Sequence, residues 1–86
     1  MYNLYILKHT ETKEIYIGKT NNLKRRFEEH NSGQQTATHR KSGQWKIVYV
    51  ETYKSKSDAD QRELKLKQHG RAKQELLKRI KSSLED

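Results

Sequence analysis

Two short runs of β-branched and aromatic residues, 4–9 and 14–19, lie only four residues apart at the start of the chain. The break between them, Thr10-Glu11-Thr12-Lys13, is entirely polar. Two such runs joined by a short polar break are typical of a β-hairpin. The chain is therefore expected to begin with part of a sheet, which the remaining residues must extend and cover.

A helix is expected next, from Leu23 to about Asn31. The side chains of Thr20-Asn21-Asn22 are suited to cap its first turn, and Ser32-Gly33 is suited to end it. Residues 32–44 are rich in Ser, Gly, Gln and Thr with basic residues among them, which indicates a flexible, positively charged loop.

The second half of the chain predicts one strand and two helices. The strand is Trp45–Tyr53. Ser57 is expected to cap a helix that continues to about His69 and is broken by Gly70. The segment from Arg71 to about Leu84 predicts a last amphipathic helix.

Together these elements predict an α+β fold, in which a three-stranded antiparallel sheet is flanked by helices in the order β-β-α-β-α-α. Runs 4–9 and 45–53 have apolar residues at consecutive positions, so we expect helices over both faces of the sheet. With 86 residues, a single domain spanning 1–86 is expected, and a chain of this size buries only about 60% of its unfolded surface.

Net charge gives the first indication of a partner. Nineteen Lys and Arg against eleven Asp and Glu leave a net charge of +8, which favours polyanions such as nucleic acids. The absence of Cys excludes disulfides and thiolate metal sites. No apolar run approaches the roughly 20 residues of a membrane span, so we expect a cytoplasmic protein without a membrane partner.

Arg26 and His30 stand out because they share a helix face with Leu23 and Phe27. At 100° per residue these four positions form one stripe, which places an Arg and a His on the side expected to pack. Structural alternatives exist for both residues. His30 could interact with the dipole at the end of the helix, and Arg26 could extend from the edge of the stripe.

Glu63 presents the same conflict on a later helix, where it falls on one stripe with Ala59, Leu66 and Gly70. A carboxylate between packing positions requires a cation, a metal ion or a protonated partner. The alternative is a solvated residue paired with Lys67 at i+4.

On the second strand, Tyr16 and Gly18 point to one side, and Ile15 and Ile17 to the other. A phenol beside a glycine leaves room for a ligand or another backbone to approach, although a half-exposed structural Tyr is the simpler interpretation. The other three histidines lack the spacing of a metal site and are interpreted as surface residues: His9, His39 and His69.

These residues together resemble the GIY-YIG nuclease superfamily, in particular its compact single-domain bacterial branch, which is related to the N-terminal incision domain of an excision-repair nuclease subunit. The similarity covers nearly the whole chain. Asn3-Leu4-Tyr5 stands where the family has Gly-Ile-Tyr, so only the tyrosine matches there. The matching segments are Ile15-Tyr16-Ile17-Gly18-Lys19-Thr20, Asn22-Leu23-Lys24-Arg25-Arg26, His30-Asn31-Ser32-Gly33 and Ala59-Asp60-Gln61-Arg62-Glu63.

The resemblance implies a metal-dependent endonuclease that hydrolyses phosphodiester bonds, of DNA rather than RNA, in repair or recombination. It also implies one Mg²⁺ or Mn²⁺ ion, which suits a single carboxylate. The implied metal ligand is Glu63, the supporting phosphate-binding residues are Lys19, Gly18 and Arg25, and the implied catalytic residues are Tyr5, Tyr16, Arg26, His30 and Glu63.

Either tyrosine could act as the general base. We expect Tyr5 to do so with His30 as a relay, and Tyr16 to position the phosphate. The pKa of a phenol in that role would have to fall, as a neighbouring metal ion, Arg26 and Lys19 would all cause.

Two other functions fit the same sequence. One is a nucleic-acid-binding module that has lost turnover, and the other is an accessory protein whose charge meets an acidic protein partner. No added DNA-reading domain is present, so targeting would come from nucleic-acid shape, from loop 32–44 or from a protein partner. The oligomeric state stays open.

Overall fold

The computed structural model describes residues 1–33 and 42–85, and its three strands form the predicted antiparallel sheet. They are β1 (Tyr2–His9), β2 (Ile15–Thr20) and β3 (Trp45–Tyr53), in the order β2-β1-β3. The sequence placed the start of β1 two residues too late. The first two strands form the expected hairpin, in which Tyr5 lies opposite Gly18.

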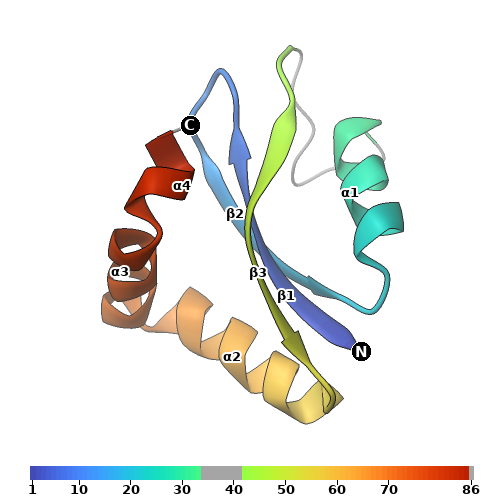
Figure 1. Ribbon diagram of the computed structural model, residues 1–86, viewed down its shortest axis with the longest axis vertical. Coiled ribbons are helices and arrows are strands. Elements are labelled where there is room, and N and C mark those ends of the chain that lie inside the picture. Colours follow the sequence, from blue (N-terminus) through green and yellow to red (C-terminus); the bar gives the residue numbers. More distant parts are fainter. Residues whose placement is uncertain (34–41, 86) are drawn as a thin grey trace.

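The helices of the described ranges that cover the sheet are α1 (Leu23–Asn31), α2 (Lys56–Gln68), α3 (Gly70–Arg79) and α4 (Lys81–Glu85). Figure 1 shows α1 on one face of the sheet and the α2–α4 layer on the other, as the consecutive apolar residues predicted. None of the helices in the described ranges is long and apolar enough to cross a membrane.

The central strand β1 contributes to two hydrophobic clusters because its side chains alternate between the two faces. Leu4 and Ile6 pack toward α2 and α3, in the cluster that contains Leu66. Tyr5 and Leu7 pack toward α1, with Trp45. Tyr5 is only 2% exposed. The side of β1 that faces α1 is therefore part of a core.

β3 is less covered than its apolar sequence predicted. It lies at the sheet edge, and its pairing with β1 shifts register between Ile6 and Leu7. Ile47 and Val50 are exposed as a result. Consecutive apolar residues identified a strand here, but they did not distinguish an edge strand from a central one.

The helix boundaries also differ from the sequence prediction. Ser55 rather than Ser57 precedes α2, and the break after it falls at His69, so Gly70 is the first residue of α3. The predicted last helix is divided at Ile80, whose side chain is buried. No Gly or Pro marks that division.

Candidate functional site

Tyr5, Tyr16 and His30 meet on the α1 face of the sheet. The Tyr5 hydroxyl and His30 Nε2 are hydrogen bonded at 2.8 Å. The His30 ring lies edge-on to Tyr16, with 4.9 Å between ring centroids, and the two tyrosine rings are 6.3 Å apart. Residues from two strands and a helix thus form one aromatic cluster.

Gly18 makes room for this cluster. A Cβ atom at position 18 would lie 2.5 Å from Tyr5 Cζ and Oη and 3.0 Å from Tyr16 Cε1. The sequence predicted open space beside Gly18 for a ligand or a backbone. That prediction was wrong, because the Tyr5 ring from the neighbouring strand fills the space.

α1 is fixed against β3 by the residue after His30. The Asn31 side chain donates from Nδ2 to the Trp45 carbonyl oxygen at 3.1 Å, and its Oδ1 accepts from the Trp45 N–H at 2.7 Å. At the other end of α1, Asn22 Oδ1 accepts from the Arg25 N–H, as the expected cap does. Both ends of the helix are therefore held, which fixes the position of His30.

Burial determines the protonation of the hydrogen-bonded pair. It raises the pKa of the Tyr5 hydroxyl, an effect that Tyr16 and Glu63 strengthen and Arg26 opposes. Burial also lowers the pKa of His30, with the Arg26 cation adding to the effect. Arg26 acts on Tyr5 in the expected direction, but burial outweighs it, so the expected fall in phenol pKa is not found in the protein alone. At neutral pH, Tyr5 is a phenol beside a neutral imidazole.

Arg26 has an unused donor within this site. Its Nε atom is buried, lies 3.6 Å from Glu29 Oε1 and makes no hydrogen bond to the part of the chain that the structure describes. A buried donor without an acceptor is uncommon in proteins and indicates a missing partner. A phosphate oxygen is an acceptor that suits a guanidinium.

Glu63 lies on α2 at the edge of the same site. Its side chain is 22% exposed, and its carboxylate oxygens lie 3.9 Å from Lys19 Nζ and 3.4 Å from Lys67 Nζ. Lys67 Nζ in turn lies 5.8 Å from the Tyr16 ring centroid. Glu63 is thus half-buried rather than packed. The ion pair with Lys67, which the sequence offered as an alternative, is present.

Asp60 was not identified from the sequence. One turn before Glu63, it accepts a hydrogen bond from Lys19 and pairs with Lys56. The shared Lys19 ammonium connects β2 to two carboxylates of α2. The spacing of Asp60 and Glu63 on one helix could have indicated that the two carboxylates lie close together. Nothing in the sequence identified Lys19 as their shared partner.

A divalent ion would rest chiefly on Glu63. The residues that the structure describes contain no group of three or more His, Asp and Glu that could hold a metal ion together. One partly exposed carboxylate fits Mg²⁺ or Mn²⁺, since these ions retain several waters and accept oxygen ligands from a phosphate. The donor set is therefore compatible with the implied ion.

The other predicted residues divide into two groups. Arg25 is exposed on the outside of α1, 3.9 Å from Glu29, where it can contact a ligand but does not join the cluster. His9 was expected at the surface but is 1% exposed, because its Nδ1 accepts the Glu11 and Thr12 N–H groups of the hairpin turn. His69 is exposed as expected, whereas His39 and most of loop 32–44 lie outside the described residues.

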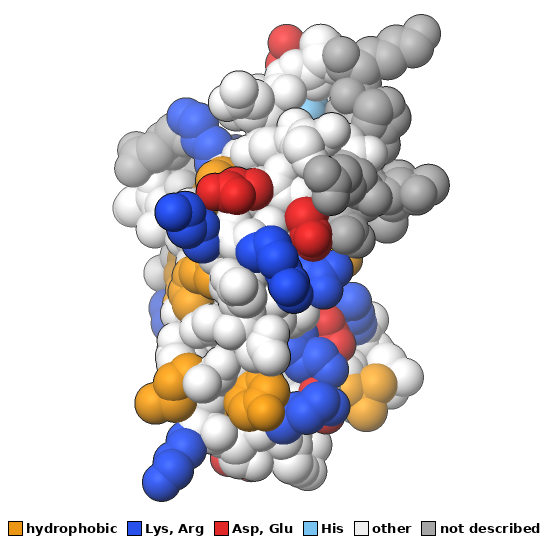
Figure 2. Space-filling model, turned by 90° about the vertical axis from the view of Figure 1, so that its right-hand side faces the viewer, with side chains coloured by type: hydrophobic (Ala, Val, Ile, Leu, Met, Phe, Trp, Pro, Cys, Tyr) orange, Lys and Arg blue, Asp and Glu red, His pale blue; other side chains and the backbone are white. Residues whose placement is uncertain are grey.

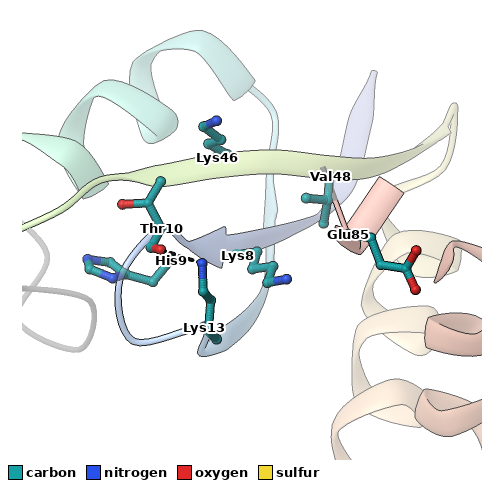
Figure 3. Close-up of a pocket in the computed structure, with 7 residues that line it drawn as sticks. All are labelled: Lys8, His9, Thr10, Lys13, Lys46, Val48 and Glu85. Carbon is teal, nitrogen blue, oxygen red and sulfur yellow. Dashed lines mark hydrogen bonds between the residues drawn. The ribbon is translucent and has the colours of Figure 1, made fainter. Parts of the chain in front are cut away.

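Two hollows adjoin the cluster. One of about 100 Å³ lies beside His30 and Trp45, and another of about 220 Å³ lies beside Tyr16 and Lys67. A separate cavity of about 260 Å³ at the hairpin end contains none of the predicted site residues. Figure 3 shows that Lys13 is turned back there to the Thr10 carbonyl, while Lys46 points away.

The surface on the α1 side is strongly basic. Figure 2 shows Lys and Arg side chains along the middle of this face, with acidic side chains among them. Lys24 and Arg25 are exposed there. This face therefore offers exposed cations to a polyanion, although Glu28 on the same helix is exposed as well.

Comparison with known proteins gives one consistent result. The family model described as the GIY-YIG catalytic domain matches residues 1–78. A UPF0213 protein from Syntrophus aciditrophicus is 39% identical over 83 residues, covering 95% of this chain and 92% of the relative. A UPF0213 protein from Clostridium perfringens is 39% identical over 67 residues, covering 78% and 71%. The solution NMR structure of a UPF0213 protein from Bacillus halodurans has a TM-score of 0.57 and 30% identity, covering 94% of this chain and 86% of that one.

Proposed function

We propose, because this chain belongs to the GIY-YIG catalytic-domain family, that it is an endonuclease that hydrolyses nucleic-acid phosphodiester bonds with one divalent ion. Family membership itself indicates nuclease activity and nucleic-acid binding. The observation that carries the proposal is the hydrogen bond between Tyr5 and a buried, neutral His30, beside an arginine with an unused donor.

The Tyr5–His30 pair moves the proton of the attacking water. A water oxygen forms a bond to phosphorus while its proton passes to the Tyr5 oxygen, and the phenol proton passes to His30 Nε2. The bond from phosphorus to the leaving sugar oxygen breaks, and that oxygen takes up a proton from solvent. His30 then releases its proton. The lowered pKa of His30 keeps the imidazole neutral at the start, and the same burial disfavours the imidazolium, so His30 carries the proton only transiently.

Tyr16 positions the phosphate. Its hydroxyl has no hydrogen-bond partner in residues 1–33 and 42–85, and its side chain is only half-buried. Arg26, whose side chain is 33% exposed, contacts a phosphate oxygen through its guanidinium, and Lys19 adds a point charge. Arg25 contacts a neighbouring phosphate from the outside of α1. Gly18 contributes indirectly, since it allows Tyr5 to reach His30.

Glu63 holds the divalent ion, Mg²⁺ or Mn²⁺. When bound, that ion stabilises charge on the phosphoryl oxygens. Lys19 and Lys67 lie 3.9 Å and 3.4 Å from this carboxylate, so a bound ion would compete with both ammonium groups. Affinity for the ion is therefore expected to be higher with substrate, whose phosphates accept the released lysines.

The proposed substrate is DNA, and the proposed process is repair or recombination. We further propose that the protein is cytoplasmic and that its chain forms one nuclease domain. A net charge of +8 supports a polyanionic substrate. The choice of DNA follows the family. We assign the choice of a particular DNA structure to recognition of the shape of that DNA or to a protein partner.

The test is incubation of nicked, branched and plain duplex DNA, and of RNA, with Mg²⁺ and then with EDTA. We expect cleavage of at least one DNA substrate with Mg²⁺, none with EDTA, and none by Glu63→Gln. Glu75→Gln is a matched control, because Glu75 lies on the outside of α3 and is 69% exposed. Cleavage that survives Glu63→Gln would contradict the assignment, and binding without cleavage would indicate the binding module instead.

A further inference from the structure

The hollow beside Tyr16 runs along the open edge of the sheet. It has a volume of about 220 Å³ and is lined by Ile15, Tyr16, Ile17, Leu66, Lys67 and Lys73. β2 is an outer strand that pairs only with β1 in the described parts of the sheet. The hollow therefore opens to the side of the sheet, directly next to the proposed catalytic cluster.

The floor of the hollow is apolar and its rim is cationic. Ile17 and Leu66 are buried, whereas Lys67 and Lys73 supply ammonium groups. Among residues 1–33 and 42–85, no acidic side chain lines the hollow. An apolar floor with a cationic rim fits one class of ligand well, a sugar–phosphate strand, because the sugars can lie on the apolar surface while the phosphates meet the ammonium groups.

The contacts of Lys73 reveal no function in holding the fold together. It is half-buried, yet within residues 1–33 and 42–85 its ammonium has no ion pair or hydrogen bond. On α2, Lys56 pairs with Asp60 and Lys67 with Glu63. Lys65 of α2 and Lys78 of α3 resemble Lys73 in lacking a described partner, but they are exposed rather than half-buried. Lys73 is thus a cation beside a hollow, and no acidic side chain of the described residues pairs with it.

Lys73 also continues a row of lysines that begins in the catalytic cluster. Lys19 lies near Glu63, Lys67 lies between Glu63 and the Tyr16 ring, and Lys73 lines the hollow with Ile15. From Lys19 to Ile15, β2 advances four residues, about 13 Å, whereas one strand of a duplex carries a phosphate about every 3.4 Å of helix axis. The row is long enough to meet several successive phosphates.

We propose that this hollow, with Lys67 and Lys73, is a subsite for the nucleotides that flank the cleaved bond on one side. The nucleic-acid strand passes from Arg26 and Lys19 across Tyr16 and along the edge of β2 to Lys73. This inference rests on the proposed function. A second copy of the chain is a poorer occupant of the same edge, because two copies of net charge +8 repel each other.

Binding of a fluorescein-labelled 20-base-pair DNA in EDTA, followed by anisotropy over a series of KCl concentrations, tests the subsite without cleavage. Lys73→Gln retains most of the side chain and removes the charge. We expect weaker binding and a slope of log affinity against log salt that is smaller by about 0.9, the loss of one phosphate contact. Lys73→Arg should retain the wild-type slope.

Lys78→Gln is the matched control, because Lys78 lies on the same helix, is exposed and does not line the hollow. It removes the same charge, so a long-range effect of net charge would appear equally in both variants. If Lys73→Gln and Lys78→Gln behave alike while the wild type binds and cleaves DNA, the subsite is wrong and the proposed function stands. If the wild type binds no nucleic acid, the proposed function fails and the subsite with it.

Discussion

The hydroxyl of Tyr5 carries the first step of the proposed proton transfer. Tyr5→Phe removes only that oxygen and retains the ring that packs in the core. We expect the rate of cleavage to fall by about 10²–10⁴-fold, as for loss of a general base, with little change in substrate binding. Tyr2→Phe is the control, because Tyr2 lies on the same strand outside the aromatic cluster. A Tyr5→Phe protein of wild-type rate would show that another group takes the proton.

The buried, neutral state of His30 makes folding sensitive to pH. Its pKa is lowered in the folded protein, so the unfolded chain binds a proton more readily and protonation favours unfolding. The free energy of unfolding should be constant above about pH 6.5, the ordinary pKa of histidine, and should decrease as the pH falls further. Urea unfolding between pH 7.5 and 5 measures this. In His30→Gln the decrease should be smaller, and an equal decrease would assign it to another group.

Two glycines permit a matched test of packing at the site. Gly18→Ala places a methyl group 2.5 Å from the Tyr5 ring, whereas a Cβ at Gly70 meets no atom within 4 Å. Overpacking costs typically about 1–3 kcal/mol, and the displaced phenol should also lose its contact with His30. Gly70→Ala should be neutral or stabilising by about 0.4–1 kcal/mol. Thermal unfolding and cleavage rates measure both, and an unaffected Gly18→Ala protein would contradict the packing described here.

The elements show which parts of the fold the sequence could predict. The hairpin, α1 and β3 follow from local patterns: runs of β-branched and aromatic residues, cap residues before Leu23, and a polar break. The division at Ile80 was not predicted, because no Gly, Pro or other local signal marks it in the sequence. The exposure of β3 depends on strand order, which is a property of the whole sheet.

The candidate site divides in the same way. Helical spacing indicated Arg26, His30 and Glu63, because polar groups at packing positions conflict with a simple core. The pairing of Asn31 with Trp45 and the contact of Lys19 with Asp60 join segments distant in sequence. Such contacts exist only in the folded chain. The sequence left two interpretations of Glu63, a carboxylate on the packing side of the helix and a solvated residue paired with Lys67. The structure has features of both, because the side chain is half-buried and pairs with Lys67.

A charged cluster holds α2 against β3 and so positions the helix that carries Glu63. Arg62 donates to both carboxylate oxygens of Glu51, and the hydroxyls of Tyr49 and Tyr53 donate to the same carboxylate. Burial alone would raise the pKa of Glu51, but these hydrogen bonds hold it below its ordinary value. Glu51 is the side chain on which the two elements converge.

Arg62→Gln should therefore destabilise the fold, since the largely buried carboxylate of Glu51 would lose some of its hydrogen bonds. We expect a loss of about 1–3 kcal/mol in the free energy of unfolding. Arg71→Gln removes a pair of the same type, between Arg71, which is 92% exposed, and Glu75, which is 69% exposed. This substitution should change the free energy of unfolding by less than about 1 kcal/mol. Equal effects of the two variants in urea unfolding would show that the cluster does not fix α2.

In the whole molecule, one face of a small sheet is used as both core and candidate active site. Tyr5 belongs to a hydrophobic cluster, and its hydrogen-bond partner His30 is 2% exposed. Glu63 reaches the same region from the helix layer on the other side, past the edge of β2, where Lys19 and Lys67 meet it. The central claim is that these groups form one site around a carboxylate able to hold a divalent ion.

Titration of the ¹⁵N-labelled protein with Mn²⁺, followed by NMR, tests that claim most directly, because the paramagnetic ion broadens the signals of nearby nuclei. We predict that broadening begins at Glu63, Lys67, Lys19 and Tyr16, spreads to Tyr5, and disappears in Glu63→Gln while Asp60→Asn retains it. Broadening centred elsewhere, or unchanged in Glu63→Gln, would contradict the account.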